Sequence, residues 1–194
     1  GDDTLNGVQG DDQLYGGLGD DFVDAGSGDD FARGGAGADM VLGFTGDDTL
    51  EGWTGNDTVI GEEGNDLIHM GSGNDLGRVD DEVSSKLYNM GQLGDDTIYG
   101  DGGDDFIGDY SGNNMLYGGD GNDLVFADEI LSLAGSNLGS SDYAYGGAGD
   151  DIIAGDDGDT LSGGSGNDAF TAVRHESSVS TVLIDDYNGN DDVI

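Results

Sequence analysis

The sequence predicts an all-β fold, a right-handed parallel β-roll (a β-solenoid) with two nonapeptide repeats per coil and a C-terminal capping segment. Three observations predict it. Glycine, aspartate and a large aliphatic residue recur at positions four, six and eight of nine-residue blocks such as GGLGDDFVD (16–24) and GWTGNDTVI (52–60). The 41 glycines supply turn residues throughout, and the chain contains neither proline nor cysteine. Nonapeptide repeats are typical of stacked β-helical arrays.

The charge of the chain limits the classes of partner that it can bind. Four Lys and Arg residues face 43 Asp and Glu residues, and the net charge of −39 argues against binding to nucleic acid or an anionic membrane surface and favours cations. No run approaches the roughly 20 apolar residues of a membrane span. Composition alone is close to that of a disordered chain, so the prediction of a fold depends on the order of the residues.

Each block predicts one strand and one loop. Positions one to six carry turn-forming residues, and positions seven to nine form a three-residue strand whose middle side chain points into the core. Glycine at positions one, two and four permits the positive φ angles and close packing of a tight loop. Two blocks then make a coil of eighteen residues, and stacked coils form two parallel sheets with strands about 4.8 Å apart.

The predicted core consists of the aliphatic residues at position eight. One sheet contributes Leu5, Val23, Val41 and Val59, and the other contributes Leu14, Ala32, Leu50 and Ile68. Position seven should face outward, and it is often apolar, as in Phe22, Met40 and Leu76 on one sheet and Phe31 and Leu67 on the other. Because stacked apolar side chains can form a patch that meets a partner, we expect a sheet face to dock a neighbouring domain or another copy.

The aspartates at position six form two columns, because residues eighteen apart lie in adjacent coils. The first column holds Asp3, Asp21, Asp39, Asp57 and Asp75, and the second holds Asp12, Asp30, Asp48 and Asp66; later blocks add Asp96, Asp105, Asp123, Asp151, Asp159 and Asp168. Stacked carboxylates repel each other by about 1 kcal/mol per neighbour even in water. A calcium ion between them reverses that sign, since it takes six to eight oxygen ligands. We therefore expect these aspartates, with loop carbonyl groups, to bind several Ca²⁺ ions.

Other metals fit this set of ligands less well. Magnesium demands a smaller and more rigid octahedron, and the loop positions lack the His and Cys that zinc favours. Asn114 replaces aspartate at one position six, so we expect a weaker or empty site there.

Two insertions interrupt the array, which we assign to residues 1–171. Residues 79–90 are either a degenerate half-coil with three extra residues or a bulge that leaves the stack. Residues 127–139 contain Ile130, Leu131, Leu133 and Ala134, which suit one or two turns of amphipathic helix or a tolerated surface excursion. Residues 172–194 form the predicted capping segment, which an open solenoid end requires to cover its core and strand edges.

The blocks fit the pattern G-G-x-G-x-D-x-U-x, where U is a large aliphatic residue, and the chain resembles the RTX, or haemolysin-type calcium-binding, repeats of secreted bacterial proteins. Its ending is similar to the segment that closes such arrays, with matches at Ile184, Asp186, Tyr187, Gly189 and Asp191. Because the chain begins inside a repeat, we expect it to be part of a longer protein with flanking domains.

The resemblance implies a calcium-binding module, secreted or at the bacterial cell surface, that folds on calcium binding and stabilises or scaffolds an attached domain. Two alternatives are a structural extender of an adhesin or surface-layer protein, and the C-terminal module of a secreted protease, lipase or alginate epimerase. His175 and Glu176 begin like H-E-x-x-H, but Val179 stands at the fifth place, and no G-x-S-x-G motif occurs. We expect no enzyme activity in this chain; any catalytic domain would lie outside it.

Overall fold

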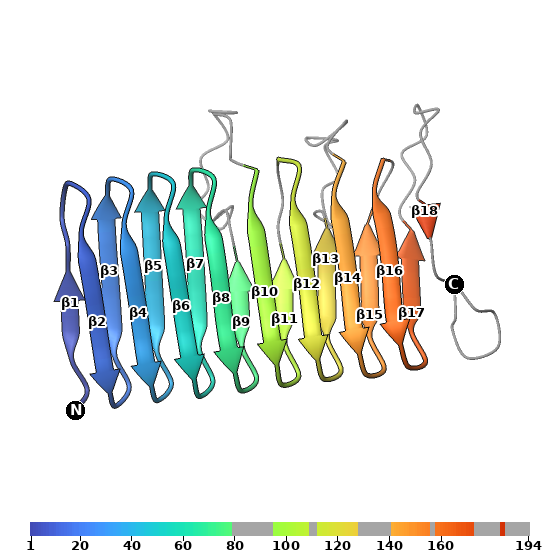
Figure 1. Ribbon diagram of the computed structural model, residues 1–194, viewed down its shortest axis with the longest axis horizontal. Helices are drawn as coiled ribbons and strands as arrows, with labels where there is room; N and C mark the ends of the chain where they lie inside the picture. The colour runs from blue at the N-terminus through green and yellow to red at the C-terminus, as the bar shows by residue number, and fades with distance from the viewer. Residues whose placement is uncertain (79–94, 109–111, 128–140, 156–157, 173–182, 185–194) are drawn as a thin grey trace.

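The computed structural model describes residues 1–78, 95–108, 112–127, 141–155, 158–172 and 183–184. These residues form two nine-stranded parallel sheets, and the chain alternates between them along the whole stack (Figure 1). The described part of the chain contains no helix, and therefore none that is long and apolar enough to cross a membrane. The predicted parallel β-solenoid is confirmed.

The odd-numbered strands form one sheet and the even-numbered strands form the other. The odd sheet contains β1 (Thr4–Asn6), β3 (Phe22–Ser27), β5 (Met40–Thr45), β7 (Thr58–Glu63), β9 (Leu76–Arg78), β11 (Phe106–Gly108), β13 (Leu124–Ala127), β15 (Ile152–Gly155) and β17 (Ala169–Ala172). The even sheet contains β2 (Gln13–Leu18), β4 (Phe31–Ala36), β6 (Thr49–Thr54), β8 (Leu67–Ser72), β10 (Thr97–Gly102), β12 (Met115–Asp120), β14 (Tyr143–Ala148), β16 (Thr160–Ser165) and β18 (Leu183–Ile184).

Equivalent positions of successive coils pair along each sheet. Val23 pairs with Val41, which pairs with Val59, so the spacing of eighteen residues sets the register. On the far side of the first predicted insertion, Ile68 pairs with Ile98. The array therefore resumes in register, whereas residues 79–90 lie outside the described part of the chain. Most of the second insertion, with its predicted helical turn, lies outside it as well.

The strands are longer than the sequence analysis predicted. Most of them contain six residues, such as Phe22–Ser27, and they cover positions seven to nine together with positions one to three of the next block. The prediction of three-residue strands is wrong because the glycine at position two does not end the pairing. Gly26 has a φ of 108° and still pairs with Phe44 in the next coil. Only positions four to six remain as the turn.

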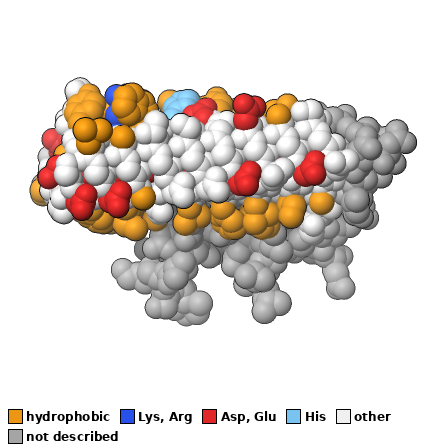
Figure 2. Space-filling model, turned by 90° about the horizontal axis from the view of Figure 1, so that it is seen from below, with side chains coloured by type: hydrophobic (Ala, Val, Ile, Leu, Met, Phe, Trp, Pro, Cys, Tyr) orange, Lys and Arg blue, Asp and Glu red, His pale blue; other side chains and the backbone are white. Residues whose placement is uncertain are grey.

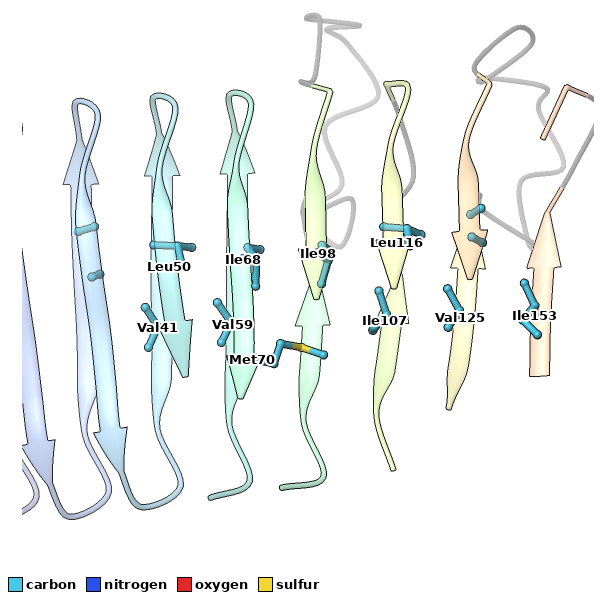
Figure 3. Close-up of a cluster of buried hydrophobic side chains, with 14 of the residues drawn as sticks. Val41, Leu50, Val59, Ile68, Met70, Ile98, Ile107, Leu116, Val125 and Ile153 are labelled. Carbon is cyan, nitrogen blue, oxygen red and sulfur yellow. The ribbon is translucent and has the colours of Figure 1, made fainter. Parts of the chain in front are cut away.

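The core is a single row of side chains from each sheet (Figure 3). The predicted residues Val23, Val41, Val59, Ala32, Leu50 and Ile68 are completely buried, Leu14 is nearly so, and Leu5 on the terminal strand is partly buried. The longer strands add position one to the core, where Ala25 and Met70 are also completely buried. Among the apolar residues predicted to face outward at position seven, Phe22, Met40 and Leu67 are exposed.

Met70 compensates for a missing apolar side chain at Gly77. Gly77 stands at position eight, where the other described blocks have an apolar side chain that ranges in size from Ala32 to Phe170. A methyl carbon on Gly77 would collide with Met70 Sδ and would lie 3.4 Å from Ile98 Cγ2. The methionine side chain therefore occupies the volume that Gly77 leaves empty between the sheets (Figure 3).

The predicted cap is described only at its centre. Strand β18 pairs in parallel with β16, with Leu183 opposite Thr160 and Ile184 opposite Leu161. Ile184 packs against the core, which is consistent with a covering role at this end. The other matches to the closing pattern, from Asp186 to Asp191, lie outside the described residues.

Candidate metal centre

The position-six residues end the turns at the two edges of the stack. One column precedes the odd strands, at the lower edge in Figure 1, and contains Asp3, Asp21, Asp39, Asp57, Asp75, Asp105, Asp123, Asp151 and Asp168. The other column, at the upper edge, contains Asp12, Asp30, Asp48, Asp66, Asp96, Asn114, Asp142 and Asp159. The structure thus brings all the predicted aspartates into two columns.

Asp142 is the column member that the sequence analysis missed. It lies in a degenerate block, Ser140–Tyr145, that lacks the glycine pattern. Its Oδ1 atom accepts a hydrogen bond from the backbone N–H of Asn114 at 2.6 Å, as its equivalents do in other coils. The signal that could have found it is the apolar residue two places later, Ala144, which is completely buried.

One carboxylate oxygen of each column residue joins adjacent coils. The backbone N–H of Asp21 donates to Oδ1 of Asp39 at 2.8 Å, and that of Asp30 donates to Oδ1 of Asp48 at 2.8 Å. The same bond recurs along both columns, including the step from Asp96 to Asn114. Oδ1 therefore has a structural role, which an amide oxygen fills equally well.

The other carboxylate oxygen is buried and has no hydrogen-bond partner among the described residues. This holds for Oδ2 of Asp12, Asp21, Asp30, Asp39, Asp48, Asp57, Asp66, Asp75, Asp105, Asp123 and Asp151. A buried, unsatisfied carboxylate oxygen is costly, and here the same oxygen is unsatisfied in coil after coil. A cation is the simplest group that would satisfy the whole set.

At several of the position-one glycines, a carbonyl oxygen of the adjacent coil lies near the Oδ2 atom. A methyl carbon placed on Gly16 would lie 2.5 Å from Asp21 Oδ2 and 2.6 Å from the carbonyl oxygen of Gly34 in the next coil. The same pair of oxygens meets at Gly43, between Asp48 Oδ2 and the Gly61 carbonyl group. Glycine at position one thus lets the Oδ2 atom and a carbonyl oxygen approach the backbone closely, and oxygen atoms are the ligands that calcium prefers.

The donor set consists of few carboxylates and many carbonyl groups. Among the described residues, no group of three or more His, Cys, Asp or Glu side chains could hold a metal ion. Each coil supplies one aspartate per edge, so most ligands of a bound ion would have to be backbone oxygens. This composition fits a hard cation such as Ca²⁺ and does not fit zinc.

Burial disfavours the ionised form of these carboxyl groups when no cation is bound. It raises the pKa of Asp48, Asp105 and Asp151 to about 7, and that of Asp57 and Asp66 to about 6. Desolvation is the largest cause, and the backbone hydrogen bond to Oδ1 partly opposes it. A divalent cation would supply the positive charge that these buried anions lack.

A second ladder at position five was also missed. In this ladder a backbone N–H group of the later coil donates to a side-chain oxygen of the earlier coil. Asp47 N–H donates to Asp29 Oδ1 at 3.0 Å, and Asn65 N–H donates to Asp47 Oδ1 at 2.9 Å. These side chains are exposed, in contrast to the buried position-six column. The signal was the recurrence of Asp or Asn at position five, since either side chain accepts the bond.

Figure 2 shows the lower edge of the stack from below, so that the turns of this edge face the viewer. Acidic side chains are spread over this edge, and apolar side chains gather along its two long borders, next to the outer faces of the sheets. The turns that carry the aspartates therefore lie between two sheet faces that both expose apolar side chains.

The comparisons with known proteins agree with this geometry. The family model described as the RTX calcium-binding nonapeptide repeat (four copies) matches residues 1–32, 15–50, 25–59, 42–76, 90–108, 109–129 and 138–159. No curated protein matches the chain. The family matches together cover well over half of the 194 residues and follow the same turns that hold the aspartate columns. The chain therefore belongs to the RTX family of calcium-binding nonapeptide repeats, and it is a β-roll that binds several Ca²⁺ ions.

Proposed function

We propose that calcium binding at the two aspartate columns drives the folding of this β-roll outside the cell, and that the folded roll stabilises or scaffolds an attached domain. The observation that carries the proposal is the series of buried Oδ2 atoms without partners. Each would be a ligand, with loop carbonyl oxygens completing the coordination. RTX repeats are typical of secreted bacterial proteins, which supports an extracellular site of action.

The difference in calcium concentration between the inside and the outside of the cell determines where the chain folds. At a dissociation constant of about 10⁻⁴ M, which is usual for extracellular modules, millimolar calcium in about twentyfold excess stabilises the folded state by about 1.8 kcal/mol per site. At the submicromolar calcium of a cell interior the same sites add almost nothing. Each coil orders many residues around a narrow core, which costs conformational entropy. Calcium binding repeated over many coils offsets this cost, so the chain folds only where calcium is abundant.

A neighbouring domain or a second copy would dock on an outer face of the roll. Phe22, Met40 and Leu67 lie exposed at position seven, and apolar side chains gather along the borders of both faces (Figure 2). Polar substitution of Phe22 and Met40 should then weaken association with the attached domain. Unchanged association would exclude the odd-sheet face as the docking surface.

Two neighbouring aspartates provide a matched test of the metal sites. Asp48→Asn removes a buried Oδ2 atom but keeps the Oδ1 acceptor, whereas Asp47→Asn makes the same charge change at an exposed position-five residue. Isothermal titration calorimetry should count fewer calcium ions for Asp48→Asn and the wild-type number for Asp47→Asn. Equal stoichiometry in both variants would show that the buried column does not bind calcium.

A further inference from the structure

A file of aromatic rings runs along the outer face of the even sheet at position nine. His69 on β8, Tyr99 on β10, Tyr117 on β12 and Tyr145 on β14 occupy paired positions of successive coils. The rings of His69 and Tyr99 stack with centroids 4.8 Å apart and planes 9° from parallel, and those of Tyr99 and Tyr117 stack at 4.9 Å and 8°. Tyr145 stands edge-on to Tyr117 at 6.5 Å.

The stacked arrangement determines which part of each ring a ligand can reach. The faces of His69, Tyr99 and Tyr117 cover one another, and the four residues of the file are half-buried, so the edges of the stacked rings face the solvent. A planar ligand that lies flat along the file would cover these edges with its face and remove apolar area from water along its whole length. The file crosses four strands, which at about 4.8 Å per strand gives a contact about 14 Å long, the length of two or three fused or linked rings.

The negative charge around the file favours cationic ligands. Asp101, on β10, is exposed, and its Oδ2 atom lies 3.6 Å from Nδ1 of His69. The chain as a whole carries a net charge of −39, and such a field concentrates cations and repels anions.

The same face already holds one planar cation among its rings. The guanidinium carbon of Arg33 lies 5.2 Å from the ring centroid of Trp53, 5.6 Å from that of Phe31 and 5.9 Å from that of Tyr15. Its Nε atom donates to Glu51 Oε2 at 2.6 Å. Arg33 belongs to the position-nine file that continues through His69. The outer face of the even sheet therefore accommodates a flat, positively charged group between aromatic side chains and a carboxylate.

We propose that the file from His69 to Tyr145 is a binding site for small planar aromatic cations, which lie lengthwise across β8, β10, β12 and β14. The rings provide an apolar contact surface, and Asp101 provides the charge. This site is separate from the calcium columns, which lie in the turns, and it needs only the folded roll.

Thioflavin T, a planar aromatic cation, is the probe for this site. Its fluorescence should rise in a saturable manner with the calcium-loaded, monomeric protein. Replacing two rings together, Tyr99→Thr with Tyr117→Thr, should weaken binding at least tenfold, whereas Tyr99→Phe with Tyr117→Phe should keep it near the wild-type value. The matched control is Phe106→Thr with Phe126→Thr, which removes the ring pair of the odd sheet and should leave binding unchanged.

Three results would overturn the proposal. The first is equal thioflavin T binding by the threonine pair and the wild type, and the second is equally tight binding of an anionic planar dye. If the threonine pair does not fold, nuclear magnetic resonance of the wild type replaces it. Saturating thioflavin T should then shift the ring resonances of His69 and Tyr99, and bound dye that leaves both unshifted is the third contradicting result.

Discussion

The two oxygens of a position-six carboxylate have separate roles. Oδ1 accepts a backbone N–H group from the preceding coil, and Oδ2 is buried beside the position-one glycine. Asn114 fills only the first of these roles. Its amide oxygen accepts the hydrogen bond from the Asp96 N–H group, but the residue carries no negative charge. We therefore expect the stack to continue past Asn114 with weaker calcium binding at that coil.

Glycine at position one should favour calcium binding in its own coil, although Ala25 and Met70 show that the stack accommodates other residues at this position. A methyl group on Gly34 would lie 2.5 Å from Asp39 Oδ2 and 2.6 Å from Asp39 Cβ. Gly34→Ala should displace that carboxylate and weaken one calcium site by about tenfold, which is about 1.4 kcal/mol, as measured by calorimetry. Gly102→Ala is the control, since its nearest neighbours lie 4.0 Å away. Wild-type calcium binding by Gly34→Ala would contradict the role of this glycine.

The pH dependence of the calcium-free chain follows from the raised pKa values. Asp48, Asp105 and Asp151 have pKa values of about 7 in the folded state, against an ordinary value of about 3.9 in the unfolded chain. The folded state thus binds protons more tightly, so its stability increases as the pH falls through about 7 and levels off near pH 4. In chelator, the far-ultraviolet circular dichroism signal of β structure should grow between pH 8 and pH 5.

Two controls accompany this pH titration. Sedimentation at each pH must show a monomer, because the isoelectric point is about 4.1 and aggregation near it would imitate folding. Asp48→Asn should gain less structure on acidification than Asp47→Asn, because Asp48→Asn removes a carboxyl group whose pKa is raised by burial. A loss of β signal on acidification of the monomer would contradict the burial of the columns.

At the scale of the strands, the nine-residue period was enough to predict the sheets, their register and the core residues at position eight, whereas the core residues Ala25 and Met70 at position one were not predicted. Strand length was not predictable from the same pattern, because a glycine such as Gly26 both permits a positive φ and continues the pairing. Five of the described non-glycine residues also take positive φ at position two, among them Phe44 and Trp53 at 76° and 94°. Neighbouring coils impose this conformation, and such long-range constraint does not appear in a local pattern.

The pair of Met70 and Gly77 tests how strictly the core is packed. Met70→Ala would leave a cavity beside Gly77, and we expect it to cost about 2–5 kcal/mol of stability. Urea unfolding at saturating calcium measures this loss. The double change Met70→Gly with Gly77→Val restores the usual arrangement of the repeat and should recover most of it. A cost below about 1 kcal/mol for Met70→Ala would show that Met70 does not fill the core.

At the scale of the whole molecule, both side-chain ladders connect one coil to the next. The position-six bonds run from the earlier to the later coil, and the position-five bonds run in the opposite direction. A coil therefore gains these bonds only when its neighbour is also folded, as in other repeat proteins whose stability resides in the interfaces between repeats. This coupling predicts that calcium-driven folding is cooperative along the stack.

The candidate sites were predictable to different degrees. The regular blocks from Asp3 to Asp75 place their aspartates by spacing alone, and Asp96 and Asp105 follow once the period resumes. Asp142 was not found, because its block has lost the glycines and only the stacking against Asn114 reveals its position. The aromatic file was not found either, since Tyr99 and Tyr117 meet only when coils stack.

Whether calcium folds this chain can be measured by calcium titration of the purified protein, followed by far-ultraviolet circular dichroism with magnesium as the control. We expect a cooperative change from coil to β structure at near-millimolar calcium and neutral pH, and no such change with magnesium. A chain that is already folded in chelator at neutral pH would contradict it, because the buried aspartate columns would then be stable without a cation.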